Sequence, residues 1–357
     1  MRYLLRVVNV PRDDVTILGH PSIGLPQPNF AHLRELTNER GLWEHASYSI
    51  PRPEHGFCND DNARALVIAA HDRTNGVSDL AAIHLQFVLD SRKSDGTFHN
   101  RRDSVGSWMD ETGSDDSQGR AWWGLGAIVA RSPKEWMQRA AFEEFESCAT
   151  FESPHMRANA YAALGAAEVI EELGGFPPAV ELLDRTSTSI AKAARTTIPW
   201  AQTRLTYDNA RIPEALLAAG VALGDERRTM LGIRLLEWLT LHESRGDRFS
   251  FTPVGGRDPG DRDPGFDQQP IEAWAMADAC YRALSVTGDS RWHEMVLRAG
   301  MWLLGENDAH AVMYEEETGA TFDGLTPTGV NLNRGAESTL AGLGILQTVA
   351  RLRPGVM

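Results

Sequence analysis

Six segments of the sequence share one pattern, in which a cluster of polar residues is followed by a run rich in alanine, leucine and glycine. These segments begin at Asp60, Asp115, Pro154, Tyr207, Phe266 and Asn333. Apolar residues recur within them at the three-to-four spacing of a helix. Charged, amphipathic segments such as 132–146 and 225–243 lie between them. This alternation of two helix types predicts a repeat of helical hairpins.

The pattern predicts twelve helices and little β-structure, which is an all-α fold. The expected ranges are 29–41, 61–74, 78–91, 116–131, 133–148, 155–173, 177–196, 208–223, 225–243, 267–287, 289–304 and 334–351. In the first of these, Asn29 is expected as the N-cap and Gly41 as the C-cap. Small residues allow close approach, so the alanine- and glycine-rich helices suit the inner ring of a closed double ring. We expect one domain over 1–357, with an N-terminal arm over about 1–28 that includes an apolar run at 4–10.

Composition excludes several classes of function. A net charge of −14 disfavours nucleic acid or an anionic membrane surface as a partner. The three cysteines are far apart and form no CxxC motif, which disfavours a disulfide framework or a zinc site and fits a reducing cytoplasm. No apolar run is long enough to span a membrane, and the first residues lack the features of a signal peptide. No HExxH, P-loop or GxGxxG after a strand occurs, so we expect no metal and no cofactor.

The polar starts of the six inner helices point to a site. If these helices run parallel, their N-termini meet at one mouth, where the clustered polar residues converge. Asp, Asn and Ser at helix starts are most often simple caps, which is the alternative for each residue taken alone. Caps do not explain the arginine, glutamine and tryptophan that follow within the first turns, nor two adjacent aspartates occurring twice.

Three motifs carry a resemblance to known proteins: TYDNARIPEAL at 206–216, FDQQPIEAW at 266–274 and NLNRGAESTLA at 331–341. With the helical pattern over about 50–350, they resemble the (α/α)6-toroid, six-hairpin glycosidase-like superfamily. They also resemble a bacterial group found beside, or fused to, polysaccharide glycosyltransferases. The resemblance implies glycan chemistry, most often hydrolysis by paired carboxylates, and the superfamily also includes sugar epimerases, phosphorylases and lyases. It further implies a functional association with a glycosyltransferase.

Hydrolysis of a glycosidic bond needs one protonated carboxyl group and one ionised carboxylate. The adjacent pairs at two successive inner helix starts can supply them, because neighbouring like charges disfavour simultaneous ionisation. A carboxylate one turn into the last helix is costly unless it is paired or used, and an ion pair with Arg64 or Arg334 is the alternative there. The catalytic candidates are therefore Asp60, Asp61, Asp115, Asp116 and Glu337.

A second set of residues is predicted to hold the sugar. Aromatic rings can stack on a sugar face, amides can bind hydroxyl groups, and arginines can orient carboxylates or hold a hydroxyl-rich ligand. Packing in the core and structural ion pairs are the alternatives for the same residues. The substrate-binding candidates are His55, Trp108, Arg120, Trp122, Tyr207, Asp208, Arg211, Gln268, Gln269, Glu272 and Asn333.

The sequence thus favours a glycoside hydrolase that acts on an oligosaccharide or polysaccharide. A non-catalytic glycan-binding module that serves a glycosyltransferase is the first alternative. A sugar epimerase or phosphorylase is the second, and an epimerase would place histidine bases in the mouth, for which His55 and His155 are the candidates.

Overall fold

The helices form two concentric rings. The computed structural model describes residues 24–74, 76–196, 199–261 and 263–352, which contain twelve α-helices. The inner ring consists of α2 (Asn59–His71), α4 (Asp115–Arg131), α6 (Met156–Leu173), α8 (Arg211–Ala222), α10 (Pro270–Thr287) and α12 (Ala336–Ala350). Each inner helix packs against the next, and α12 packs against α2, so the ring is closed. The expected all-α toroid is confirmed.

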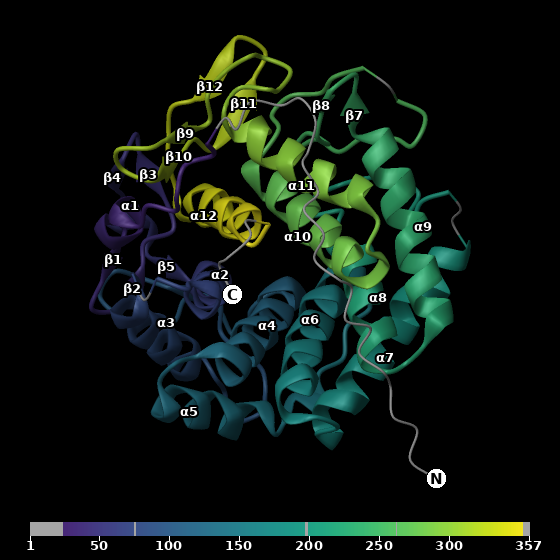
Figure 1. The fold of residues 1–357 in the computed structure, drawn as a ribbon. Helices are drawn as coiled ribbons and strands as arrows, with labels where there is room; N and C mark the ends of the chain where they lie inside the picture. The colour runs from purple at the N-terminus through teal and green to yellow at the C-terminus, as the bar shows by residue number, and fades with distance from the viewer. Residues whose placement is uncertain (1–23, 75, 197–198, 262, 353–357) are drawn as a thin grey trace.

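The outer ring covers the inner one. It consists of α1 (Ala31–Glu35), α3 (Ser78–Asp90), α5 (Glu135–Phe145), α7 (Pro177–Thr196), α9 (Glu226–His242) and α11 (Ser290–Leu303). Each of α3, α5, α7, α9 and α11 packs on the inner helix that precedes it, whereas α1 packs on α12 (Figure 1). The α5 helix buries Met137, Ala141 and Phe145 at four-residue spacing, which is the single apolar stripe expected of an outer helix.

Small residues set the spacing of the inner helices. A Cβ atom added at Gly126 of α4 would overlap the carbonyl of Gly165 in α6, and one added at Gly165 would overlap the carbonyl of Trp122. A Cβ atom at Gly119 would likewise overlap the backbone of Ala158. The alanine and glycine content read from the sequence is therefore the condition for backbone contact between α4 and α6.

The two ends of the double ring differ in the length of their loops. Each inner helix from α2 to α10 is joined to its outer partner by a short connection, such as 132–134 or 288–289. The return to the next inner helix is long, as in 91–114, 243–269 and 304–335. All the long returns lie at the end where the inner helices begin, so they build the mouth of the ring.

The long returns contain β-structure that the sequence did not reveal. The described residues include six antiparallel pairs: β1 (Thr37–Asn38) with β2 (Gly41–Leu42), β3 (Ala46–Ser47) with β4 (Ile50–Pro51), β5 (Phe57–Cys58) with β6 (Arg101–Arg102), β7 (Ser244–Arg245) with β8 (Arg248–Phe249), β9 (Tyr314–Glu315) with β10 (Ala320–Thr321), and β11 (Gly324–Thr326) with β12 (Gly329–Asn331). Strands of two or three residues are too short to show an alternating pattern.

One helix prediction was wrong in extent. Helix α1 ends at Glu35 rather than at Gly41, and β1 and β2 follow it. Gly41 is not a C-cap: it lies in β2 with φ of 145°, where an added Cβ atom would meet Phe87 and Asn62. Asn29 accepts a hydrogen bond from the backbone of Ala31, but the N-cap of α1 is Phe30, so the predicted cap at Asn29 was one residue off. Most of the expected N-terminal arm, including the run at 4–10, lies outside the described residues.

Among the described helices, none combines the length and the apolar character needed to cross a membrane.

We predict that Gly165→Ala destabilises the fold despite the higher helix propensity of alanine. The new methyl group would press on the backbone of α4, and overpacking of this kind costs about 1–3 kcal/mol. Chemical denaturation measures the change in the free energy of unfolding. Gly175→Ala is the matched control, because a Cβ atom there has open space, and it should change stability by less than about 0.5 kcal/mol. Equal stability of the two variants would contradict the close packing of α4 and α6.

Candidate active site

A cavity of about 460 Å³ lies at the mouth of the ring. Polar side chains dominate its wall, and they come from the starts of α2, α4, α10 and α12, from the segment before α8, and from the long returns. The lining residues are Glu44, His45, Cys58, Asp60, Asp61, Arg64, Arg120, Tyr207, Asp267, Gln269, Pro270, Ile271, Asp323, Asn331, Gly335, Ala336, Glu337 and Ser338. Of the six helix starts predicted to meet around one cavity, five contribute to this wall, whereas the start of α6 (Met156–Leu173) contributes no lining residue.

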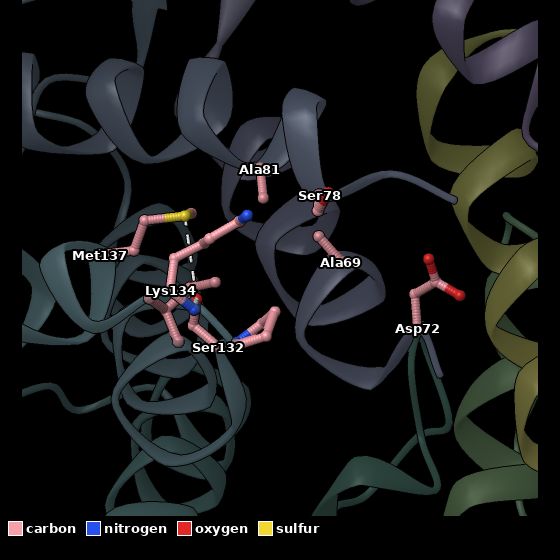
Figure 2. Close-up of a pocket in the computed structure, with 9 residues that line it drawn as sticks. Ala69, Asp72, Ser78, Ala81, Ser132, Lys134 and Met137 are labelled. Atoms are coloured by element: carbon pink, nitrogen blue, oxygen red, sulfur yellow. Dashed lines mark hydrogen bonds between the residues drawn. The ribbon is translucent and has the colours of Figure 1, made fainter. Parts of the chain in front are cut away.

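A second hollow lies at the other end of the ring. Figure 2 shows it near the end of α2 and the start of α3, with Ser132, Lys134 and Met137 beside it. Its volume is about 10 Å³, which corresponds to about one water molecule. It therefore has no room for a sugar, and the mouth is the candidate site.

Asp60 is held as an anion on one side of the cavity. Its Oδ1 accepts a hydrogen bond from Nη1 of Arg120 at 2.9 Å, and its Oδ2 accepts one from Asn100 at 3.2 Å. Burial alone would raise the pKa of Asp60, but the positive charges of Arg120 and Arg64 outweigh it and the pKa is lowered. Asp60 is thus ionised where it lines the cavity.

Arg64 joins the first and last inner helices. It donates to Asp61 at 2.6 Å and to Glu337 at 2.7 Å. The ion pair proposed from sequence as the alternative role of Glu337 therefore exists, with Arg64 as the partner; Arg334 pairs with Glu315 instead. Burial nevertheless raises the pKa of Glu337, and the pull of Arg64 does not fully offset it.

Glu44 is the most notable lining residue that sequence reasoning missed. It lies between β2 and β3, its side chain is 11% exposed, and it hydrogen-bonds to Arg101. Burial and the negative charge of Asp61 raise its pKa to about 7, against the opposing effect of Arg101. No motif marks this position in the sequence. Its proximity to Asp61 depends on the path of the β2–β3 segment over the start of α2.

Asp267 and Asp323 form an acidic pair beside α10 and α12. Asp267 precedes α10, and its Oδ1 is buried without a hydrogen-bond partner among the described residues. Asp323 follows β10, and its Oδ1 accepts hydrogen bonds from the backbone of Gly335 at 2.7 Å and from Ser338 at 2.5 Å. Burial and the charge of Asp323 together raise the pKa of Asp267. Neither aspartate was predicted from the sequence.

Beneath the cavity, a buried polar chain links α4, α6 and α10 with the segment before α8. Arg120 donates to the hydroxyl of Tyr161 at 2.8 Å, and this hydroxyl donates to Asp208 at 2.5 Å. Asp208 has a left-handed backbone with φ of 50°, and its amide donates to Glu272. Burial, with the nearby charges of Glu243 and Asp208, raises the pKa of Glu272 well above the ordinary range. Asp208 and Glu272 therefore support the site from below rather than line it.

Tyr207 and Asp116 complete this side of the mouth. Tyr207 lines the cavity and is 42% exposed, and its hydroxyl donates to Asp116 at 2.6 Å. Burial and Asp116 raise the pKa of Tyr207, so the phenol is neutral at physiological pH. Asp116 also lies 3.9 Å from Arg120 and touches two residues that line the cavity. Gln269, predicted to bind substrate, lines the cavity as well.

Three predicted substrate-binding residues lie in the core instead. Trp122 is fully buried between Phe98 and Phe145. Arg211 is enclosed by Glu214 and Asp278 and stacks between two tryptophan rings, so the structural alternative holds for it. Gln268 is buried and ties the backbone of Phe251 to Gly265 and to the side chain of Asp308.

Four other predicted residues lie outside the cavity wall. Asp115, at the start of α4, accepts a hydrogen bond from Ser153 at 2.6 Å. It does not share the contacts of the adjacent Asp116 with Tyr207 and Arg120. Trp108 stacks on His99 of the same 99–113 loop and contacts Phe87 of α3 edge-on. His55 contacts the cavity residue His45 edge-on, at 4.9 Å between ring centroids, without lining the cavity. Asn333 accepts a hydrogen bond from the backbone of Tyr48 and thus fixes a rim loop.

Comparison with known proteins places the fold in context. No protein-family profile matches the chain, and no curated protein sequence does. Among solved structures, a sugar epimerase from a ruminal bacterium aligns over 90% of this chain and 95% of its own, with a TM-score of 0.66 and 14% identity. A D-mannose isomerase aligns over the same fractions, with a TM-score of 0.67 and 12% identity.

A cellulase from C. cellulolyticium, in complex with cellobiose, aligns over 89% of this chain and 88% of its own, with a TM-score of 0.60 and 10% identity. The chain has the six-hairpin (α/α)6 toroid fold. Epimerases, isomerases and glycoside hydrolases share this toroid, and at such low identity the likeness establishes the fold alone.

We predict that Arg120→Met lowers the free energy of unfolding by about 3–5 kcal/mol, because it leaves the largely enclosed carboxylate of Asp60 without its main cation. Denaturant titration measures the loss. Arg139→Met is the matched control: Arg139 pairs with Glu135 at 3.2 Å on the surface of α5, where such a pair contributes about 0.3–0.5 kcal/mol. A loss at Arg120 no larger than that at Arg139 would contradict the buried network.

Proposed function

We propose that this protein is a glycoside hydrolase whose active site is the mouth cavity. The supporting observation is a pair of carboxyl groups with opposite pKa shifts that both line this cavity. Glu44 has a pKa of about 7 and Asp60 has a lowered pKa. Glycosidases need this combination of a protonated acid and an ionised carboxylate near neutral pH.

The two carboxyl groups take different roles in the proposed reaction. Glu44 donates its proton to the oxygen of the leaving sugar. Asp60 remains charged, held by Arg120, and acts on the anomeric carbon directly or through a water molecule. Arg120, Asn100 and the chain through Tyr161 and Asp208 fix the position of Asp60 before substrate binds.

The cavity suits a carbohydrate in size and lining. Its volume of about 460 Å³ lies within the range of about 300–1,000 Å³ typical of small-molecule sites. Gln269, Asn331 and Ser338 offer donors and acceptors for hydroxyl groups, and Tyr207 offers a partly exposed ring. The toroid shared with a cellulase that binds cellobiose supports the same proposal.

We predict that Glu44→Gln and Asp60→Asn each reduce kcat by about 10²–10⁴-fold, the usual contribution of a general acid or base. The assay is release of reducing sugar from an oligosaccharide panel, read by mass spectrometry. Asp115→Asn is the matched control because its carboxylate bonds to Ser153 outside the cavity, and it should keep activity within about twofold of the wild type. Wild-type activity in both Glu44→Gln and Asp60→Asn would refute the assignment.

The pH profile tests the same roles. Glu44 must be protonated, so activity falls as the pH rises through about 7. Asp60 must be ionised and its pKa is lowered, so the acid limb lies below the ordinary range of an aspartate. Binding of the glycan with no cleavage under any condition would favour the non-catalytic module instead.

A sugar epimerase is the second candidate, and one histidine favours it. His45 lines the cavity beside His55, and burial followed by the charge of His55 lowers its pKa, which suits a neutral base. The sugar epimerase and D-mannose isomerase with the same fold support this candidate. His155, the other candidate base, is exposed on the far side of Asp115 and does not line the cavity.

We predict no exchange of carbon-bound hydrogen when the protein acts on sugars in heavy water, because hydrolysis breaks a C–O bond only. An epimerase that removes a proton beside the carbonyl would introduce deuterium at that carbon. NMR and mass spectrometry of the products measure the incorporation. Deuterium uptake that His45→Ala abolishes would establish the epimerase and overturn the hydrolase.

The association with a glycosyltransferase and the cytoplasmic location remain predictions that rest on the resemblance and on cysteine usage.

A further inference from the structure

Acidic side chains outnumber cationic ones in the cavity. Its described wall carries six carboxyl groups and two guanidinium groups. The carboxyl groups are those of Glu44, Asp60, Asp61, Asp267, Asp323 and Glu337. The cations are Arg64 and Arg120, and His45 adds no charge at neutral pH because burial and His55 lower its pKa.

Both arginines are already engaged by the protein. Arg64 donates to Asp61 and Glu337, through one nitrogen each. Arg120 donates to Asp60 through Nη1 and to Tyr161 through Nη2, and Asp116 and Asp208 lie 3.9 Å from it. A sugar carboxylate or sulfate would therefore find no unengaged cation on this wall and would meet the carboxyl groups instead.

Two carboxyl groups on the α10–α12 side have no cationic partner among the described residues. Asp267 lies against Gly324, the residue after Asp323, and a Cβ atom at Gly324 would overlap Oδ1 of Asp267. This Oδ1 accepts no hydrogen bond from the described residues. Asp323 is oriented by Gly335 and Ser338, but both bring only neutral donors. Two like charges thus adjoin on the wall without compensation, which is costly in a partly buried site.

We propose that the cavity selects a sugar with a free amino group, whose ammonium lies between Asp267 and Asp323. An ammonium group supplies a positive charge and three hydrogen-bond donors, enough to serve both carboxylates. A hydroxyl group at the same place supplies one donor and no charge. This inference rests on the proposed glycosidase site and assigns its substrate class, an amino sugar rather than an anionic one.

Binding of monosaccharides tests the proposal without any cleavage, because a monosaccharide has no glycosidic bond. The probes are glucosamine, N-acetylglucosamine, glucose and glucuronate at pH 6, with affinities measured by calorimetry or ligand-observed NMR. We expect glucosamine to bind at least about tenfold more tightly than glucose, and glucuronate not to bind. Raising the ionic strength should shrink the preference, since salt screens the charge interaction.

Asp267→Asn is the decisive variant, because it removes one charge and Oδ1 of Asp267 has no hydrogen-bond partner among the described residues. It should bring the affinities for glucosamine and glucose within about twofold of each other while glucose affinity is retained. Asp323→Asn is a second test of the same loss of preference. Asp115→Asn, outside the cavity, should keep the wild-type preference. Thermal unfolding of each variant verifies that it is folded.

Equal binding of glucosamine and glucose by the wild type, or preferential binding of glucuronate, would overturn the proposal. So would a glucosamine preference that survives both substitutions. Failure of the glycosidase proposal gives a different result: amino-sugar binding without cleavage of any glycan. Cleavage of neutral glycans with no amino-sugar preference would overturn this inference and leave the glycosidase proposal standing.

Discussion

Backbone contact between the inner helices is the constraint on which the rest of the structure depends. Gly119, Gly126 and Gly165 leave no room for a side chain between α4 and α6, so the helix starts are drawn into a narrow ring. Within that ring, charged residues from different hairpins come within hydrogen-bond distance. Arg120 meets Asp60 and Tyr161, and the bonds from Arg64 tie α2 to α12. Close packing of small residues thus makes possible the electrostatics of the mouth.

The carboxyl groups of the cavity differ in the charge of the groups around them. Asp60 is compensated by arginine and stays charged, whereas Glu44 and Asp267 are partly buried near other acids and have raised pKa values. Different environments within one cavity thus give its carboxyl groups different pKa values, which is the requirement for acid–base catalysis. The same arrangement leaves Asp267 and Asp323 without a cationic partner among the described residues. Catalytic capacity and ligand preference therefore have a common electrostatic origin in the proposed site.

The sequence predicts the scaffold better than the site. The range of α7 was predicted to the residue and most other helices to within a few residues, because each presents several turns of periodic pattern. The ion pair of Glu337 with Arg64 was one alternative to a catalytic role, beside a pair with Arg334, because a carboxylate inside an inner helix needs a partner. Glu44, Asp267 and Asp323 were missed, since they lie in irregular returns whose path is set by distant contacts. Trp122 was misplaced because two residues along a helix turn the side chain about 200°, away from the face of Arg120.

Closure of the ring has a consequence for how the site comes into being. The last inner helix along the chain, α12, carries Glu337 and Ser338 and packs against α2, which begins nearly 280 residues earlier. Before α12 docks, Arg64 has only one of its two acidic partners and Asp323 lacks the donors from Gly335 and Ser338. During synthesis the first five inner helices can therefore assemble as an open arc, but the mouth cavity is complete only once α12 has docked.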